Sequence, residues 1–164
     1  MWITRAAWGA KPLTAWSQHV APSYRTGVVI HHSVTAEGKS RKQVEATLRQ
    51  IDDLHRAKGY GGIGYNVVVD YAGRIYRARG VNRMGCHTVN NNARYFGVCY
   101  IGDGRKRITP EATKAIQNVV ARLQKKSGHK LDVVGHQDLY ATACPGDKIY
   151  KKIQQGVFDV PYKR

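Results

Sequence analysis

The stretch Gly27-Val28-Val29-Ile30-His31-His32-Ser33 is a short apolar run that ends in two adjacent histidines. A run of this length and composition is typical of a buried strand. Because side chains alternate between the two faces of a strand, only one of the two histidines can point to a given side of the sheet. The pattern alone leaves open which of them does so.

Two strong helical patterns lie after this strand. The segment 40–58 is predicted to be a helix, because Ser40 and Gln43 form a capping-box pattern at its start. A second helix is predicted between Thr109, a good N-cap residue, and Gly128, a typical C-terminal stop. The buried face of the first helix is predicted to consist of Val44, Leu48, Ile51, Leu54 and His55.

Further strands are predicted on both sides of the second helix. Residues 65–70 and 74–79 have the pattern of a hairpin that turns at 71–73. Strands are also predicted over 95–101 and 131–135, and a weaker helix over 147–153. Strands that alternate with helices predict an α/β fold with a central mixed β-sheet flanked by helices. Trp2, Trp8 and Trp16 are expected to attach the irregular first 26 residues to this body.

Length and composition restrict the class of protein. A chain of 164 residues is close to one domain, so we expect a single domain over 1–164. With 42% hydrophobic and 23% charged residues, the chain is neither disordered nor fibrous. No apolar run approaches the ~18 residues that a membrane helix needs, so no transmembrane segment is expected. The first residues also lack the apolar stretch of a secretory signal.

The charge balance is strongly basic. The 27 Lys and Arg residues exceed the 11 Asp and Glu residues, which gives a net charge of +16. This charge favours a polyanionic partner: nucleic acid, an anionic membrane surface or an anionic cell wall. The alternative is a basic surface that is merely solvated. No nucleic-acid-binding motif accompanies the charge, because the run 105–107 is too short to be one.

A histidine and a cysteine lie eight positions apart near the C-terminus. His136 ends a predicted strand, and Cys144 lies in the loop that follows. Imidazole and thiolate are both good zinc ligands. Together with a histidine at the end of strand 27–33, they would supply three protein ligands and leave a fourth position for water, as in catalytic zinc sites. The alternative is that the histidines simply bond backbone carbonyl groups.

Several short motifs of this chain occur in the order and spacing of one enzyme family. The chain resembles the type 2 N-acetylmuramoyl-L-alanine amidases, which include small phage lysins and the peptidoglycan recognition proteins. The resemblance covers roughly residues 2–153. The motifs that carry it are Val29-Ile30-His31-His32-Ser33, Gly62-Ile63-Gly64-Tyr65-Asn66, Gly85-Cys86-His87-Thr88, Phe96-Gly97-Val98, Val134-Gly135-His136 and Ala143-Cys144-Pro145-Gly146.

The resemblance implies one zinc ion per chain and a set of ligands. Carried onto this sequence, the ligands are His31, His136 and Cys144, and His32 is expected to face the other side of the sheet. Tyr65 matches the catalytic tyrosine of the family, which is expected to bind either the zinc-bound water or the developing oxyanion. Thr142 corresponds to a catalytic position that is lysine in some members and threonine in others.

Three further positions are also interpreted through the family. His87 matches a family histidine that lines the substrate groove, and the alternative is that it makes a structural hydrogen bond. Asn92 is a second candidate for the groove. In another branch of the family a catalytic glutamate stands where this chain has Cys99, so a glutamate base is excluded here. Cys99 lies in an apolar strand pattern and is expected to be a small core residue.

The implied activity is hydrolysis of the amide between N-acetylmuramic acid and L-alanine in bacterial peptidoglycan, by the catalytic domain of a phage lysin. The expected partners are peptidoglycan and anionic cell-wall polymers, with no specific nucleic-acid binding. A lysin would be made in the host cytoplasm and act on the wall after release. The alternative is a non-catalytic peptidoglycan-binding module of the same fold, but such members lose the cysteine ligand, whereas this chain keeps Cys144.

Overall fold

The molecule is built around one five-stranded mixed sheet. The structure, a computed structural model, describes residues 1–14 and 17–164. The strands follow the order β3-β2-β4-β1-β5 across the sheet, and only β3 runs antiparallel to its neighbour. Their bounds are β1 Gly27–His32, β2 Val67–Val69, β3 Ile75–Arg77, β4 Tyr95–Tyr100 and β5 Asp132–Gly135. The predicted mixed sheet is therefore confirmed.

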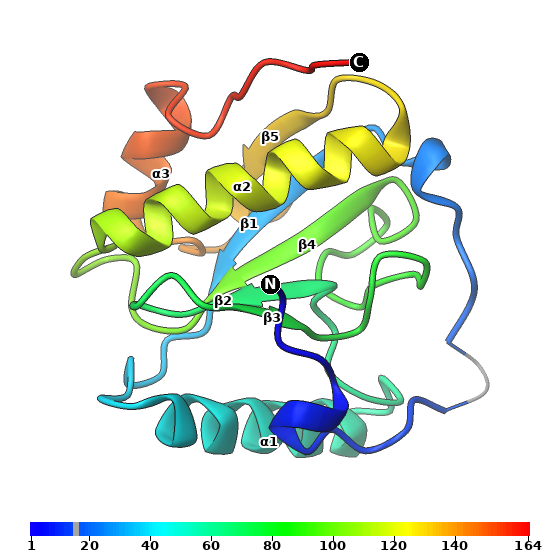
Figure 1. Ribbon diagram of the computed structural model, residues 1–164, viewed down its shortest axis with the longest axis vertical. Coiled ribbons are helices and arrows are strands. Elements are labelled where there is room, and N and C mark those ends of the chain that lie inside the picture. Colours follow the sequence, from blue (N-terminus) through cyan, green and yellow to red (C-terminus); the bar gives the residue numbers. More distant parts are fainter. Residues whose placement is uncertain (15–16) are drawn as a thin grey trace.

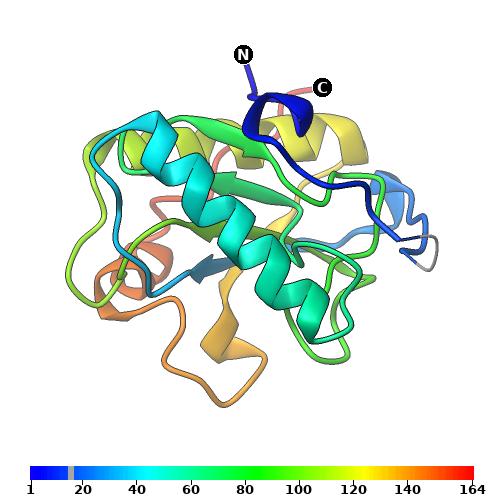
Figure 2. The same ribbon diagram turned by 90° about the horizontal axis from the view of Figure 1, so that it is seen from below.

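Helices cover both faces of the sheet. Figure 1 shows α2 (Pro110–Ser127) and α3 (Asp147–Gln154) on one side and α1 (Arg41–Ala57) on the other. Figure 2 shows α1 lying obliquely across its face of the sheet. The α/β layer arrangement agrees with the prediction. Within the described part of the chain, no helix is long and apolar enough to cross a membrane.

The two long helices begin where the sequence predicts. The Ser40 hydroxyl accepts a hydrogen bond from the Gln43 amide at 3.3 Å, and the Thr109 hydroxyl accepts one from the Ala112 amide at 3.1 Å. These bonds satisfy amide groups that have no partner inside the helix. At the other end of α2, Gly128 has a φ of 80°, a conformation in which glycine is favoured.

The buried face of α1 differs from the prediction at one position. Leu54 is 55% exposed, whereas Asp52 is buried. Each residue turns a helix by about 100°, so Leu54 lies roughly a quarter turn from the centre of the buried stripe. The Asp52 carboxylate accepts a hydrogen bond from the Ile63 amide at 2.7 Å and one from Arg56 Nε at 2.6 Å. These bonds compensate its burial and fix the loop after α1.

Tryptophan residues attach the N-terminal segment to the body. Trp8, in the short helix η1 (Ala6–Trp8), is fully buried, and its indole N–H donates to the Arg77 carbonyl at 2.7 Å. Trp2 is partly buried against the core under α2. The third predicted anchor, Trp16, lies outside the described residues.

The sheet register places two candidate ligands at one edge. β1 and β5 are parallel neighbours, and Ile30 pairs with Gly135. The next residue of each strand is a histidine, His31 in β1 and His136 directly after β5. Because parallel strands end at the same edge, the two imidazoles are brought side by side.

Candidate metal centre and cleft

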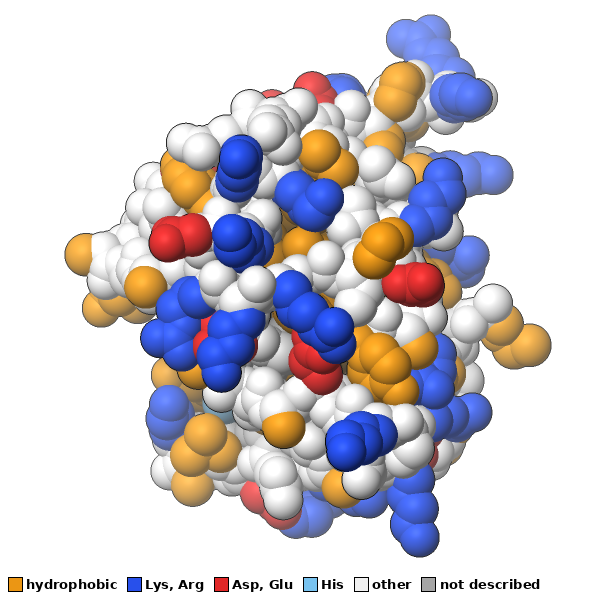
Figure 3. Space-filling model, turned by 90° about the vertical axis from the view of Figure 1, so that its left-hand side faces the viewer, with side chains coloured by type: hydrophobic (Ala, Val, Ile, Leu, Met, Phe, Trp, Pro, Cys, Tyr) orange, Lys and Arg blue, Asp and Glu red, His pale blue; other side chains and the backbone are white. Residues whose placement is uncertain are grey.

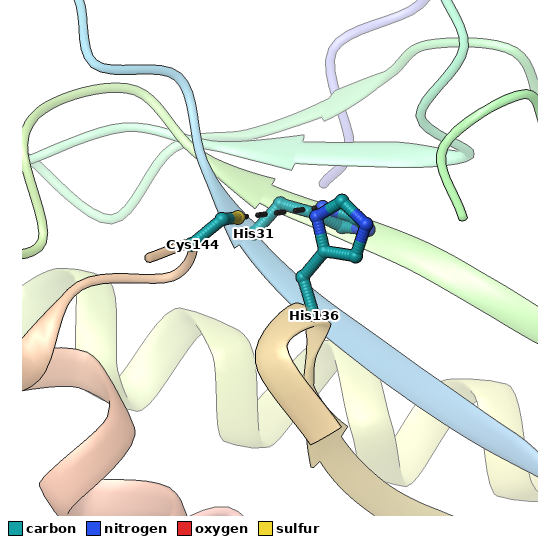
Figure 4. A group of neighbouring side chains, drawn as sticks. All are labelled: His31, His136 and Cys144. Carbon is teal, nitrogen blue, oxygen red and sulfur yellow. Dashed lines mark hydrogen bonds between the residues drawn. The ribbon is translucent and has the colours of Figure 1, made fainter. Parts of the chain in front are cut away.

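Three side chains from distant parts of the sequence meet at the end of β1. His31 is buried, and His136 and Cys144 are half-buried beside it. Their candidate ligand atoms all lie within 4.8 Å of one another. Figure 4 shows the three side chains pointing toward one another, with His136 coming from the end of β5 and Cys144 from a loop. The grouping that the sequence suggested is present in the structure.

Hydrogen bonds in the loop hold this group together. The short helix η3 (His136–Asp138) follows β5, and the Gly135 amide donates to the Asp138 carboxylate at 2.8 Å. The Gln137 amide donates to the Cys144 carbonyl at 2.9 Å. This second bond closes the loop and brings the cysteine back to the histidine.

The donor set fits zinc. The distance between His31 Nδ1 and Cys144 Sγ is 3.6 Å. A tetrahedral ion with bonds of about 2.3 Å to sulfur and 2.0–2.1 Å to nitrogen separates those two atoms by about 3.6 Å. Two imidazoles and one thiolate also match the ligand types that zinc prefers, and the three leave one coordination position for another group.

Burial sets the protonation of these groups in the protein. It holds the pKa of His31 well below its ordinary value, and it also lowers the pKa of His136. Both imidazoles are therefore neutral at neutral pH, which is the form that binds a metal. Burial raises the pKa of the Cys144 thiol to about 11, so metal binding would release the proton of this thiol.

His87 holds the His31 ring in place through a hydrogen bond. Nδ1 of His31 faces the sulfur, so the proton of the neutral ring lies on Nε2, which donates to His87 Nδ1 at 3.0 Å. The proton of His87 then lies on Nε2 and donates to the Tyr95 carbonyl at 3.3 Å. This chain of bonds fixes the orientation and the tautomer of the candidate ligand, as partners of metal-binding histidines commonly do.

The His87 ring is closely enclosed. A Cβ atom at Gly85 would lie 2.4 Å from its Cδ2 atom, and one at Gly97 would lie 2.6 Å from it. The Asn92 side-chain oxygen accepts hydrogen bonds from the amides of His87 and Thr88, at 2.8 and 2.9 Å. Both residues expected to line a groove do border the cleft, and their hydrogen bonds hold this loop and His31 in place.

His32 makes a different set of contacts. Its Nδ1 accepts a hydrogen bond from the Gly104 amide at 3.0 Å and lies 3.8 Å from the Asp103 carboxylate. His32 lies on the same face of β1 as Val28 and Ile30, which belong to the core under α2. His32 therefore fixes the loop after β4 and is not a member of the three-residue group.

A cleft of about 550 Å³ opens over the candidate centre. No carboxylate lies among its described lining residues, and its fixed positive charges come from Lys58 and Arg105, of which Arg105 is paired with Asp103. A neutral or anionic ligand therefore suits the cleft better than a cation. The lining consists of His31, His32, Val34, His55, Lys58, Tyr60, Tyr65, Cys86, His87, Thr88, Val89, Asn92, Arg105, His136, Tyr140, Thr142, Ala143 and Cys144.

The two proposed catalytic side chains border this cleft. The Tyr65 ring lies with its centroid 5.2 Å from that of His31, and burial raises the pKa of its hydroxyl, which stays protonated. The Thr142 hydroxyl accepts a hydrogen bond from the Cys144 amide at 3.2 Å, which leaves its own proton available. Cys99 is fully buried beneath the cleft side of the sheet, as expected of a core residue.

Some cleft residues were not predicted from the sequence to belong to the site. The exposed Tyr140 ring stacks on His136 with centroids 5.7 Å apart. His55 is buried and accepts a hydrogen bond from the Gly64 amide at 2.9 Å, as a core histidine would, but it also forms part of the cleft wall. Val34 has a φ of 56°, which is rare for a β-branched residue, and it stands exposed at the rim. Only the folded chain shows that these residues share one site.

Known proteins are similar to this chain in sequence and in fold. Peptidoglycan-recognition protein SC2 of Drosophila melanogaster is 30% identical over 158 residues, which cover 93% of this chain and 84% of that protein. The crystal structure of peptidoglycan recognition protein-LE in complex with tracheal cytotoxin, a monomeric diaminopimelic acid-type peptidoglycan, superimposes with a TM-score of 0.88. It is 27% identical, and the match covers 94% of this chain and 92% of that one.

A bacterial enzyme shares the fold. The N-acetylmuramoyl-L-alanine amidase LysC from Clostridium intestinale has a TM-score of 0.74 at 24% identity, and the match covers 96% of this chain and 97% of that one. Residues 22–147 match the family described as N-acetylmuramoyl-L-alanine amidase, and this range contains all three candidate ligands. The chain belongs to the N-acetylmuramoyl-L-alanine amidase family.

Proposed function

We propose that this protein is a zinc-dependent amidase that hydrolyses the bond between N-acetylmuramic acid and L-alanine in bacterial peptidoglycan. The observation that carries the proposal is the complete donor set of His31, His136 and Cys144 at the floor of an open cleft. A family member with only a binding role has no need of three ligands that meet in this way. We further propose that it acts as a lysin on the wall, after release from the cell that makes it, because a net charge of +16 suits an anionic wall.

Different residues of the chain would have different roles in this reaction. Bound zinc would polarise the amide carbonyl and lower the pKa of a coordinated water toward about 7. His31, His136 and Cys144 would hold the ion, and His87 would keep His31 in the required orientation. The protonated Tyr65 hydroxyl would donate to the oxygen of the amide as negative charge develops on it.

The charges of the cleft favour a peptidoglycan fragment as ligand. Stem peptides carry carboxylates, and the cleft offers the Lys58 ammonium and the Arg105 guanidinium, with no carboxylate among its described lining residues. The related protein-LE binds tracheal cytotoxin, a peptidoglycan fragment. We propose that this chain binds its substrate in the corresponding cleft.

The direct test is the chemistry of the products. Purified peptidoglycan incubated with the zinc-loaded protein should release peptides with a free L-alanine amino terminus, and a chelator should stop the release. The second candidate function, a non-catalytic binding module, predicts binding to the same material with no new alanine amino groups. One zinc per chain together with product release would support the enzyme, and release that survives complete zinc removal would contradict it.

Tyr65→Phe is expected to lower turnover by roughly 10²–10³, because loss of one oxyanion donor typically has that effect. The ring and its packing against His31 remain, so zinc content should not change. Turnover on a soluble muramoyl-peptide and zinc per chain should be measured on the same preparation. A variant with normal turnover would show that the hydroxyl has no role in the reaction.

His87→Phe is expected to weaken zinc binding by roughly 10- to 100-fold, as is typical when the partner of a metal-binding histidine is lost. Phenylalanine keeps a planar ring between Gly85 and Gly97 but cannot accept from His31 or donate to Tyr95. Competition with a chromophoric chelator measures the affinity. An unchanged zinc affinity would contradict the supporting role of His87.

A further inference from the structure

A second pocket gathers basic side chains from several parts of the chain. This basic pocket has a volume of about 490 Å³ and shares no lining residue with the cleft. Its five cations are Arg5 from the N-terminal segment, Arg77 from the end of β3, Arg83 from the loop after β3, and Arg122 and Lys126 from α2. No motif of the sequence marks the pocket, because its members are scattered over more than a hundred positions.

The cations of the basic pocket lack ion-pair partners. No carboxylate is among its described lining residues, and none of its five cations forms a salt bridge within residues 1–14 and 17–164. Arg77 and Lys126 have no side-chain hydrogen-bond partner in the same part of the chain. Arg122 and Lys126 also lie four positions apart on α2, a spacing at which like charges destabilise a helix. An anion bound in this pocket would relieve the repulsion.

Several other arginines of the protein form ion pairs with carboxylates. Arg105 is paired with Asp103 at 2.7 Å, and Arg107 contacts Glu37. On the face shown in Figure 3, acidic side chains lie among the basic ones. The five cations of the basic pocket differ from these arginines, because none of the five has a carboxylate partner among the described residues.

Several of the guanidinium groups are held in place without being neutralised. Arg5 donates to two backbone carbonyl groups, and Arg83 donates to the Ser17 carbonyl at 2.7 Å. The Arg122 guanidinium lies over the Trp2 ring, 5.0 Å from its centroid. Carbonyl groups and aromatic faces fix the position of a cation but leave its net charge. Positive groups that are already ordered lose less entropy when an anion binds.

We propose that the basic pocket binds phosphodiester groups of an anionic polymer of the bacterial cell wall. Guanidinium groups match the oxygen atoms of a phosphate group in charge and in geometry. The choice of a wall polymer rests on the proposed function. The basic pocket and the cleft share no lining residue, so a polymer bound in the pocket leaves the cleft open to peptidoglycan.

The lining argues against single-stranded nucleic acid as the ligand. Sites for such strands combine positive charge with aromatic rings on which bases stack. Trp2 is the one aromatic residue among the described lining residues, and Arg122 already occupies a face of its ring. A polyol phosphate chain needs no stacking surface and is compatible with this pocket.

The test compares two variants that have the same net charge of +13, three below the +16 of the protein. Both change only exposed side chains to glutamine, so both should fold. The pocket variant carries Arg77→Gln, Arg122→Gln and Lys126→Gln. The control variant carries Lys114→Gln, Lys125→Gln and Lys163→Gln, which border a different hollow beside α2.

Binding of a purified poly(glycerol phosphate) is measured by titration calorimetry over a range of salt concentrations. The pocket variant should bind at least about tenfold more weakly than the control. The slope of log affinity against log salt concentration should be smaller in magnitude by about two for the pocket variant than for the control, as expected for three lost phosphate contacts. Equal weakening of both variants, or of neither, would overturn the proposal.

Two further measurements complete the test. A single-stranded oligonucleotide with the same number of phosphates should bind the protein more weakly than the wall polymer, and tighter binding that depends on the pocket would overturn the choice of ligand. Hydrolysis of a small soluble muramoyl-peptide should be equal in both variants, and slower hydrolysis by the pocket variant alone would contradict the separation of pocket and cleft. A protein that binds the polymer but never hydrolyses the peptide would contradict the proposed function and leave the basic pocket supported.

Discussion

Cys144→Ser is expected to abolish release of alanine-terminated peptides from purified cell wall. The thiol lies 3.6 Å from His31 Nδ1 and is the only sulfur in the candidate metal group. Serine places a hydroxyl, a much poorer zinc ligand, where a thiolate would bind. Loss of a supporting partner alone weakens a metal site by roughly 10- to 100-fold, so loss of a ligand should exceed about 100-fold.

Cys86→Ser is the matched control for this experiment. Cys86 is also a half-buried, free cysteine that borders the cleft, but it does not belong to the metal group. Zinc per chain and turnover should be determined for both variants and for the unchanged protein. Zinc and turnover should fall together in Cys144→Ser and remain in Cys86→Ser. Full turnover by a zinc-free Cys144→Ser protein would rule out the zinc mechanism.

His31→Ala and His32→Ala are expected to have different effects on bound zinc and on stability, although the two residues are neighbours. His31→Ala removes a ligand and should eliminate bound zinc. His32→Ala should keep the zinc but lower the free energy of unfolding by about 1–3 kcal/mol, because the buried Gly104 amide loses its acceptor. The difference follows from the alternation of side chains along β1.

The two variants require two measurements each. Metal analysis gives zinc per chain, and urea unfolding of the zinc-free proteins gives stability without the contribution of the metal. His31→Ala is the variant expected to lose zinc. Zinc that is lost from His32→Ala and kept by His31→Ala would reverse the assignment of the ligands.

Much of the architecture was predictable because its causes are local. The helix that follows Ser40 and the one that follows Thr109 are specified by a capping residue and an apolar stripe within one segment. Gly128 ends the second helix for an equally local reason, its positive φ. The wrong prediction at Leu54 is also informative. Its hydrophobicity suggested burial, but its angular position around α1 leaves the side chain exposed. Whether a residue is buried depends on the layer that covers it.

The sequence by itself determined the strand that ends in His31 and His32, the two long helices and, through motif order, the candidate ligands. Only the tertiary structure decided the contacts between distant segments. The bond between His31 and His87 joins residues 56 positions apart, and the basic pocket joins Arg5 to Lys126. The physical reason is that periodicity and capping act within a few turns of chain, whereas these contacts depend on strand register and layer packing, which form only when the whole sheet is assembled.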